Sequence, residues 1–340
     1  MTESGLAEER FEVPSSREVQ RRWRWGRKGL QIVLGLGLGA ASVAYVFRDT
    51  TLMDALAVLQ QVLSGWVLLA VGLVALTQVA KVFRWRLILG GTTATVSRWR
   101  LWRGLLVGQA LNLLVPVRVG DVARAYLTGR GTVGSIFTFY TVVVEKAWEV
   151  VMLLVCLGAL LAWGPWPIWL SRVGILVSGA GLAAICGGLV LVWQGRDRLV
   201  AWAETMDGQH SLWLKQLVKP AVDLADSLAG AARDGRLAGM TAASLGVWGL
   251  GAATNVVVFL ALGISVHWSA SLLILAAIYV GVVIPAPPAR IGLFHLLVLL
   301  SLATYGVDRD EALACGIVLH LVVVVPLLLA GGMAALVSDT

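Results

Sequence analysis

The stretch Pro116-Val117-Arg118-Val119-Gly120 decides the fold, because the other half of the chain repeats it as Pro288-Ala289-Arg290-Ile291-Gly292. Each copy follows a run rich in Leu, Ile and Val. Proline and glycine interrupt helices, and an arginine is costly in hydrocarbon. One such combination in each half predicts two related halves that meet around a polar site. That arrangement is typical of proteins that move something across a bilayer.

The composition places the chain in a membrane. Of its 340 residues, 58% are hydrophobic and 14% are charged, whereas a soluble domain carries about 25% charged residues. The mean hydropathy is +0.83. We therefore expect an all-α polytopic membrane protein of about six to eight transmembrane helices. The apolar segments that are long enough, or nearly so, are residues 29–47, 63–80, 136–162, 173–193, 240–262 and 312–336.

Two shorter apolar runs, 104–117 and 270–284, each end near one copy of the repeated stretch. Apolar runs of about 10–14 residues are more often re-entrant or interfacial than spanning. Residues 291–304 would form the returning arm of the second run. The pattern therefore predicts two broken or re-entrant hairpins.

Basic residues indicate the topology, because Lys and Arg accumulate on the cytoplasmic side of a membrane. Arg21–Lys28 and the cluster from Lys81 to Arg103 are both basic and should both lie inside. The first hairpin then enters from inside and the second from outside, which predicts an inverted internal repeat. We expect a multi-pass protein of the cell (inner) membrane with both termini cytoplasmic. Its parts are a basic cytoplasmic tail 1–28, a first membrane half 29–193, a cytoplasmic loop 194–239 and a second membrane half 240–340.

The first candidate cluster contains Asn112, Pro116, Arg118, Asp121 and Arg124. Arg118, Asp121 and Arg124 would share one helical face at i,i+3 spacing. The preceding glycine would let a helix begin there, with the aspartate near its N-cap. A helix N-terminus with two guanidiniums suits a phosphate. The alternative is a helix start at the inner interface, with arginines that extend to water.

The second candidate cluster contains Glu145, Lys146 and Glu149. Two carboxylates at i and i+4 repel each other unless a cation lies between them. A carboxylate inside the membrane is a functional candidate and requires a basic partner, for which Arg118, Arg124 and Arg290 are the candidates. The alternative is that the span begins later and the cluster lies at the interface.

The third candidate cluster contains Pro285, Pro288, Arg290 and His295. With Pro287 it has three prolines in four residues, which no continuous helix accommodates. Irregular backbone at membrane depth is tolerated only against protein or a water-filled cavity. The histidine could relay protons, although a lone histidine in an apolar helix is more often a hydrogen-bonded packing residue.

A basic and aromatic stretch contains Lys81, Arg84, Trp85 and Arg86. We expect it at the membrane interface, in contact with anionic lipid head groups on the cytoplasmic face. A specific ligand role is the secondary interpretation.

The sequence contains no motif for a cofactor or a catalytic metal. It has no P-loop, no HExxH and no GxSxG, and its three cysteines are scattered without metal spacing. We expect no enzyme activity, no cofactor and no metal. The net charge of +7 is a topology signal and does not indicate nucleic acid. The expected partners are membrane lipids, and homo-oligomerisation stays open.

These clusters, in this order, resemble the lysylphosphatidylglycerol synthase/flippase transmembrane family. The matching motifs are Arg84-Trp85-Arg86, Asn112 to Arg124, Glu145 to Glu149 and Pro285 to His295. Where the family has Gly-Gly and a final Glu in the last motif, this chain has Ala289-Arg290 and His295. The resemblance does not extend to the synthase domain.

The resemblance implies flippase- or scramblase-like translocation of an anionic or zwitterionic phospholipid, or of a lipid-linked head group, across the membrane. Two alternatives stay open. One is a secondary transporter or channel for a small anion. The other is a non-transporting partner subunit of a membrane glycosyltransferase.

Labelling of single introduced cysteines tests the predicted topology. Both termini and residues 194–239 should react only from the cytoplasmic side, because of the basic clusters. Residues 163–170 and 305–311 should react from outside. Labelling of residues 205–235 from outside would contradict the inverted repeat.

Overall fold

The computed structural model describes residues 64–115, 119–164, 178–184, 229–281 and 287–337, together with isolated positions between 37 and 45 and between 172 and 201. Every regular element within these residues is helical. The α-helices are α3 (Ser64–Leu89), α4 (Arg98–Leu114), α5 (Gly120–Gly129), α6 (Ser135–Trp163), α10 (Arg236–Ala261), α11 (Ser269–Gly281), α12 (Leu293–Ala303) and α13 (Arg309–Leu336). Two short 3-10 helices are η1 (Gly90–Thr95) and η2 (Pro288–Arg290). The predicted tail 1–28, the span 29–47, and most of residues 173–193 and 194–239 lie outside the described residues.

Among the described residues, three helices are long and apolar enough to cross a membrane, namely Gly65–Leu89, Arg236–Ala261 and Arg309–Leu336. The last two correspond to the predicted spans 240–262 and 312–336. The predicted span 63–80 ends too early, since α3 continues through its basic residues to Leu89. A span predicted from hydropathy ends at the first charged residue. The helix itself continues until its backbone is interrupted, here at the Gly90-Gly91 pair. The longest helix, α6, has 29 residues and contains all three charges of the second cluster.

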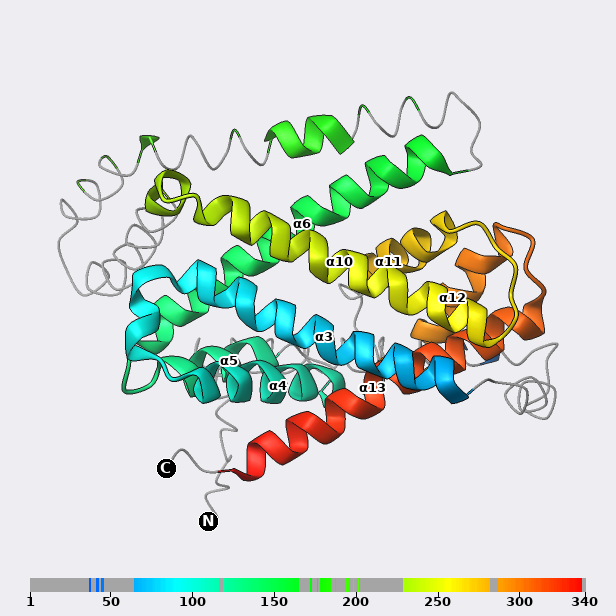
Figure 1. The fold of residues 1–340 in the computed structure, drawn as a ribbon, viewed down its shortest axis with the longest axis horizontal. Helices are drawn as coiled ribbons and strands as arrows, with labels where there is room; N and C mark the ends of the chain where they lie inside the picture. The colour runs from blue at the N-terminus through cyan, green and yellow to red at the C-terminus, as the bar shows by residue number, and fades with distance from the viewer. Residues whose placement is uncertain are drawn as a thin grey trace, which may run out of the picture.

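The helices α3 and α10 lie side by side and antiparallel along the length of the bundle (Figure 1). Gly239 of α10 permits this approach, because a Cβ there would lie 3.1 Å from a methyl group of Leu87. The C-terminal half of α13 packs against α4, where a Cβ on Gly331 would lie 2.4 Å from Ala110 Cβ. Small residues at helix contacts are the usual means of close packing in membranes.

Two short antiparallel hairpins lie at opposite ends of the α3–α10 pair (Figure 1). In the first, α4 packs against α5, and Arg100 Nη1 near the start of α4 donates to Arg130 O just after α5, at 3.2 Å. In the second, α11 packs against α12, and the hydroxyls of Ser269 and Tyr305 lie 2.8 Å apart. Each hairpin therefore begins and finishes at the same end of the bundle.

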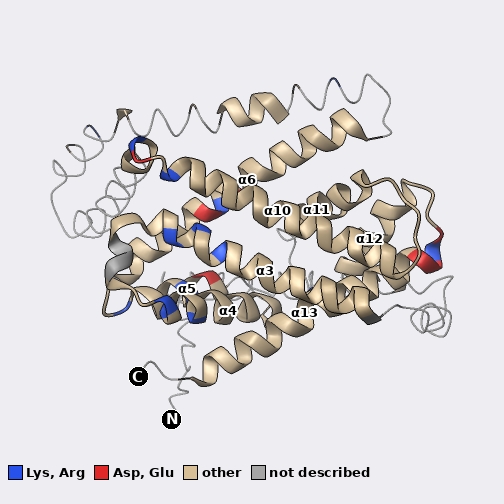
Figure 2. Ribbon diagram, in the orientation of Figure 1, with Lys and Arg blue, Asp and Glu red and all other residues tan. Residues whose placement is uncertain are grey.

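The two ends of the bundle differ in composition. Trp163 and Trp268 meet at one end with ring centroids 6.4 Å apart, and Tyr305 lies at that end through Ser269. At the other end, Arg103 Nε donates to Ala334 O at 3.1 Å. Figure 2 shows basic residues gathered at this second end, on α4, α5, the last turns of α3 and the start of α10. The side of the membrane on which each end lies stays a prediction.

Apolar side chains cover much of the outer surface. Exposed examples on α3 and α13 are Leu68, Leu76, Phe83, Leu329 and Met333. Soluble monomers rarely expose contiguous apolar surface of this kind. In hydrocarbon the same side chains are in their preferred solvent.

Gly120→Ala should destabilise the protein, because its Cβ would lie 1.9 Å from the backbone oxygen of Gly108 in α4. Backbone cannot move aside cheaply, so we expect a loss of about 1–3 kcal/mol, the usual range for overpacking. Thermal unfolding in detergent measures it. The matched control is Gly72→Ala in α3, where nothing lies within 4 Å of the new Cβ. Equal melting temperatures for the two variants would contradict close packing of α4 on α5.

Candidate functional site

Glu145 of α6 lies between two arginine side chains. Its Oε1 is 2.9 Å from Arg84 Nη2 of α3, and its Oε2 is 2.7 Å from Arg124 Nη2 of α5. The exposed fractions of the Arg84, Arg124 and Glu145 side chains are 0%, 4% and 2%. A carboxylate buried without cations costs several kcal/mol. The two guanidiniums therefore explain how α6 can carry a charge inside the bundle.

Glu149 extends this charge network by one helical turn. Its Oε1 is 3.1 Å from Arg84 Nη2, and its Oε2 is 3.2 Å from Lys146 Nζ. The other terminal nitrogen of Arg84, Nη1, donates to Ser244 Oγ of α10 at 3.4 Å. Arg84 thus lies between the two carboxylates and supplies the cation that their i,i+4 spacing requires. We use "charge network" below for Arg84, Arg124, Glu145, Lys146 and Glu149.

Trp85 holds the guanidinium of Arg124 in place. The Arg124 Cζ lies 3.6 Å from the centroid of the Trp85 ring, which is a stacking contact. The indole is itself fixed, since Trp85 Nε1 donates to Thr141 Oγ1 of α6 at 3.0 Å. A guanidinium stacked on an aromatic face keeps its planar fork oriented for an oxyanion.

Asn112 joins the end of α4 to the start of α5. Its Oδ1 accepts from Gly120 N at 2.9 Å, and its Nδ2 donates to Asp121 Oδ1 at 3.1 Å. The helix begins at Gly120, as the sequence predicts, with Asp121 in its first turn. This start sets the position of Arg124 one turn later. Pro116 and Arg118, predicted in the same cluster, lie outside the described residues.

Lys81 lies one turn before Arg84 on α3. Its Nζ donates to Gln109 Oε1 of α4 at 3.5 Å, and Gln109 Nε2 donates to Gln78 Oε1 at 2.8 Å. In the part of the chain that the structure describes, no carboxylate lies within ion-pair distance of Lys81.

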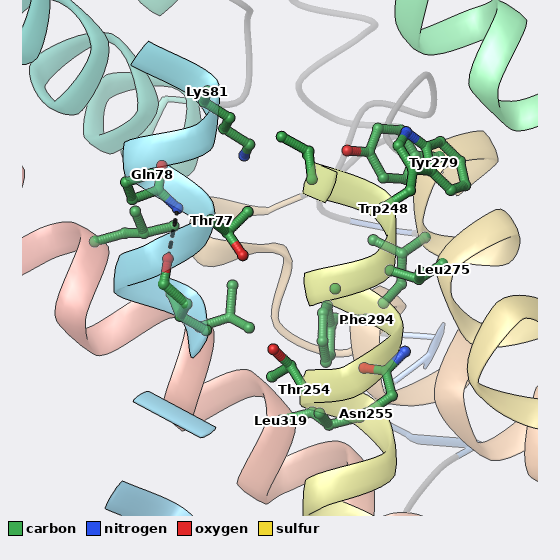
Figure 3. A pocket seen from close by; sticks show the side chains of 16 residues that line it. Thr77, Gln78, Lys81, Trp248, Thr254, Asn255, Leu275, Tyr279, Phe294 and Leu319 are labelled. Carbon is green, nitrogen blue, oxygen red and sulfur yellow. Dashed lines mark hydrogen bonds between the residues drawn. The ribbon is translucent and has the colours of Figure 1, made fainter. Parts of the chain in front are cut away.

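A cavity of about 150 Å³ opens beside Lys81. It lies between α3 and α10, with α11, α12 and α13 completing its wall (Figure 3). Lys81 and Tyr279 are at one end of the cavity in this view, and Phe294 and Leu319 lie toward the other. The cavity therefore has Lys81 at the end next to the charge network, and Thr254 and Asn255 lie with Phe294 and Leu319 at the other end.

The third cluster forms a separate break in the helical structure. As predicted, the described prolines are not in a continuous α-helix, since Pro288 begins a 3-10 helix and α12 begins only at Leu293. Pro288 begins η2, which packs against α4, the helix that leads into the first copy of the repeated stretch. Arg290 belongs to none of the ion pairs of the charge network. Pro285 lies outside the described residues.

Two histidines support this break. The rings of His295 and His320 are 4.9 Å apart. Gly292 N donates to His295 Nδ1 at 3.4 Å, and His320 Nε2 is 2.8 Å from Ala289 O. Both rings thus contact the irregular backbone in a hydrogen-bonded packing role.

The structure corrects one expectation and completes another. Arg84 and Trp85 were expected at lipid head groups, but both are fully buried, while Arg86 on the same helix is exposed. Arg124 is confirmed as a partner of Glu145, whereas Arg84 was missed as the second one. The sequence offered one signal for it: no proline or glycine lies between Arg84 and Gly90, so the helix could be expected to continue past Arg84.

The described helices define a multi-pass α-helical membrane protein. Residues 32–331 match the family described as the lysylphosphatidylglycerol synthase TM region, and the chain belongs to this family. The match covers the transmembrane region and no synthase domain. No curated protein and no solved structure matches the chain.

Glu145→Gln should lower stability, because it leaves Arg124 buried without its carboxylate, whereas Arg84 keeps Glu149. Breaking a buried pair in this way costs on the order of 3–5 kcal/mol. The double variant Glu145→Gln with Arg124→Gln should recover part of this loss. Thermal unfolding in detergent measures both effects.

The control for this cycle is Asp234→Asn, which removes a carboxylate from an exposed ion pair with Arg236. Exposed pairs contribute little, so its melting temperature should stay close to that of the wild type. A Glu145→Gln variant as stable as this control would mean that the charge network does not hold the helices together.

Proposed function

We propose that the protein moves an anionic or zwitterionic phospholipid, or a lipid-linked head group, between the two leaflets in the manner of a flippase or scramblase. The observation that carries this proposal is the pair of buried guanidiniums, Arg84 and Arg124, that converge on Glu145 inside the bundle. The family supports movement of a lipid, because it is linked to translocation of the lipid that the synthase makes.

The charge count at the site argues for an anionic ligand. Arg84, Arg124 and Lys146 contact two carboxylates, Glu145 and Glu149, and Lys81 is a fourth cation beside them. The Lys146 side chain is 40% exposed, whereas the two guanidiniums are buried. Asp121, held by Asn112, lowers the excess without removing it. Excess cations inside an apolar bundle are costly. A phosphate would compensate them with strong, charge-assisted hydrogen bonds.

The two hairpins suit a path through the membrane. In this proposal α4–α5 and α11–α12 re-enter from opposite leaflets and form an inverted repeat. Three observations support it: each hairpin begins and finishes at one end, the two hairpins use opposite ends, and η2 packs against α4. A head group could then reach the site from either side.

The mechanism follows from exchange of ion-pair partners. In the structure, Glu145 occupies the guanidiniums of Arg84 and Arg124. An arriving phosphate takes over these donors, and the freed carboxylates face a cationic part of a zwitterionic head group. The acyl chains stay in the bilayer, against the exposed apolar side chains of the outer surface. The remaining proposed substrate ligands are Asn112, Pro116, Arg118, Asp121, Lys146, Glu149, Pro285, Pro288, Arg290 and His295.

Reconstitution into vesicles tests the proposal. The vesicles contain fluorescent phosphatidylglycerol or phosphatidylcholine, and an added quencher reports the label that reaches the outer leaflet. Wild-type protein should accelerate the exchange of phosphatidylglycerol. Arg124→Gln should slow it about tenfold or more, which corresponds to one lost charge-assisted interaction. Arg124→Lys should restore only part of the rate, because an ammonium cannot replace the stacked guanidinium fork.

The matched control is Arg98→Gln, which removes an exposed arginine at the start of α4 and should leave the rate unchanged. Wild-type vesicles that exchange chloride but no lipid would contradict the proposal and favour an anion transporter. Exchange of neither, with the protein recovered in complex with a membrane glycosyltransferase, would favour a partner subunit.

A further inference from the structure

The cavity beside Lys81 has a donor end. Figure 3 shows the Lys81 ammonium and the Tyr279 hydroxyl pointing toward one another across this end. The ammonium donates one long hydrogen bond, 3.5 Å to Gln109 Oε1. Among the described residues, the Tyr279 hydroxyl has no hydrogen-bond partner. Two donors with unused capacity therefore face the same space.

Trp248 Nε1, from the ring that stacks on Tyr279, is a third donor without a hydrogen-bond partner among the described residues. The remaining polar groups on the wall donate hydrogens within the protein. Thr77 Oγ1 donates to Leu73 O at 2.8 Å, and Thr254 Oγ1 donates to Leu250 O at 2.8 Å. Asn255 Nδ2 donates to Ser271 O at 3.0 Å. The free donors are thus concentrated at the Lys81 end, next to Arg84 and its carboxylates.

Rigid packing holds the Tyr279 hydroxyl in this position. The Tyr279 ring stacks on Trp248 of α10 with centroids 4.4 Å apart and an interplanar angle of 21°. Stacked rings have few alternative rotamers, so the hydroxyl is preorganised for a ligand. The rest of the wall is mostly apolar and includes Leu275, Phe294, Leu319 and Val323.

We propose that this cavity binds a compact anionic oxygen group carried on an apolar chain, with Lys81 as its ion-pair partner and the Tyr279 hydroxyl as a second donor. A phosphate monoester on a diacylglycerol and a carboxylate on a fatty chain share this chemistry. The inference rests on the proposed function and names the chemical class of lipid that the site selects.

The size of the cavity sets the size of the head. At roughly 30 Å³ for each water-sized group, about 150 Å³ holds about five such groups. A phosphate, with one phosphorus and four oxygens, has this number of heavy atoms, whereas a head group that carries an amino acid or a sugar is larger.

Native mass spectrometry of the purified full chain in detergent tests the proposal with four probes. Dioleoyl phosphatidate and oleate carry the two compact anionic heads, dioleoyl phosphatidylcholine carries a bulky zwitterionic one, and inorganic phosphate is a head without a chain. Phosphatidate or oleate should bind more tightly than the last two. Lys81→Met should weaken that binding about tenfold or more, and Tyr279→Phe about fivefold.

Two comparisons isolate the site. Arg98→Met removes an exposed cation and should bind like the wild type, and Lys81→Arg should keep most of the affinity because the charge is retained. If Lys81→Met does not fold, acetylation of wild-type Lys81 replaces it as the measurement. Phosphatidate or oleate should then protect the Lys81 amine, and phosphatidylcholine should not.

Binding of phosphatidate alone, or of oleate alone, identifies the source of the anionic group and supports the proposal. Equal affinity for phosphatidylcholine, unchanged binding by Lys81→Met, or no protection of the Lys81 amine would overturn it. The vesicle assay separates the two proposals. If the wild-type protein exchanges lipid but Lys81→Met binds the probes as the wild type does, only the cavity proposal is refuted. If the wild-type protein moves no lipid, the proposed function is refuted.

Discussion

The ion pairs of Glu145 with Arg84 and Arg124 are the constraint on which the rest of the structure depends. They join α3 to α5 and α6, which follow it by more than thirty residues in sequence, at a point that water does not reach. None of these helices can slide by even one turn without leaving a charge unpaired, and an unpaired charge in an apolar bundle costs more than the packing would regain. The network therefore fixes the register of the bundle, and the cavity beside Lys81 keeps its shape because its α3 wall is fixed in this way.

Close glycine contacts provide the second constraint, and they lie at helix contacts outside the charge network. Hydrocarbon supplies no hydrophobic force that drives helices together, so contact area between backbones must provide the attraction. Gly108 and Gly120 bring α4 and α5 together, and Gly331 brings α13 against α4. Charged pairs thus determine which residues face each other, and glycines determine how closely the helices approach.

The interruption of the helix at Pro288, the start of a helix at Gly120 and the Arg124–Glu145 ion pair could be predicted from the sequence. Each depends on local backbone chemistry or on a charged residue that requires a partner inside a membrane. Arg84 could not be assigned in the same way. Hydropathy ends a span at the first cluster of charges, while this arginine is paired with carboxylates from a helix more than fifty residues away in sequence. The cavity was also beyond prediction, since its wall comes from α3, α10, α11, α12 and α13.

The turn before α12 has a consequence for the conformational energy of the chain. Ala289 and Arg290 have φ angles of 54° and 56°, in the left-handed region that glycine adopts without cost. An L-residue there pays roughly 1–2 kcal/mol, so the turn stores strain that the contact of His320 with Ala289 O helps to retain. Glycine at position 289 would release part of that strain and remove only one methyl group. The same turn is therefore a natural place to gain thermal tolerance in a membrane protein intended for purification, while the guanidinium of Arg290 stays where it is.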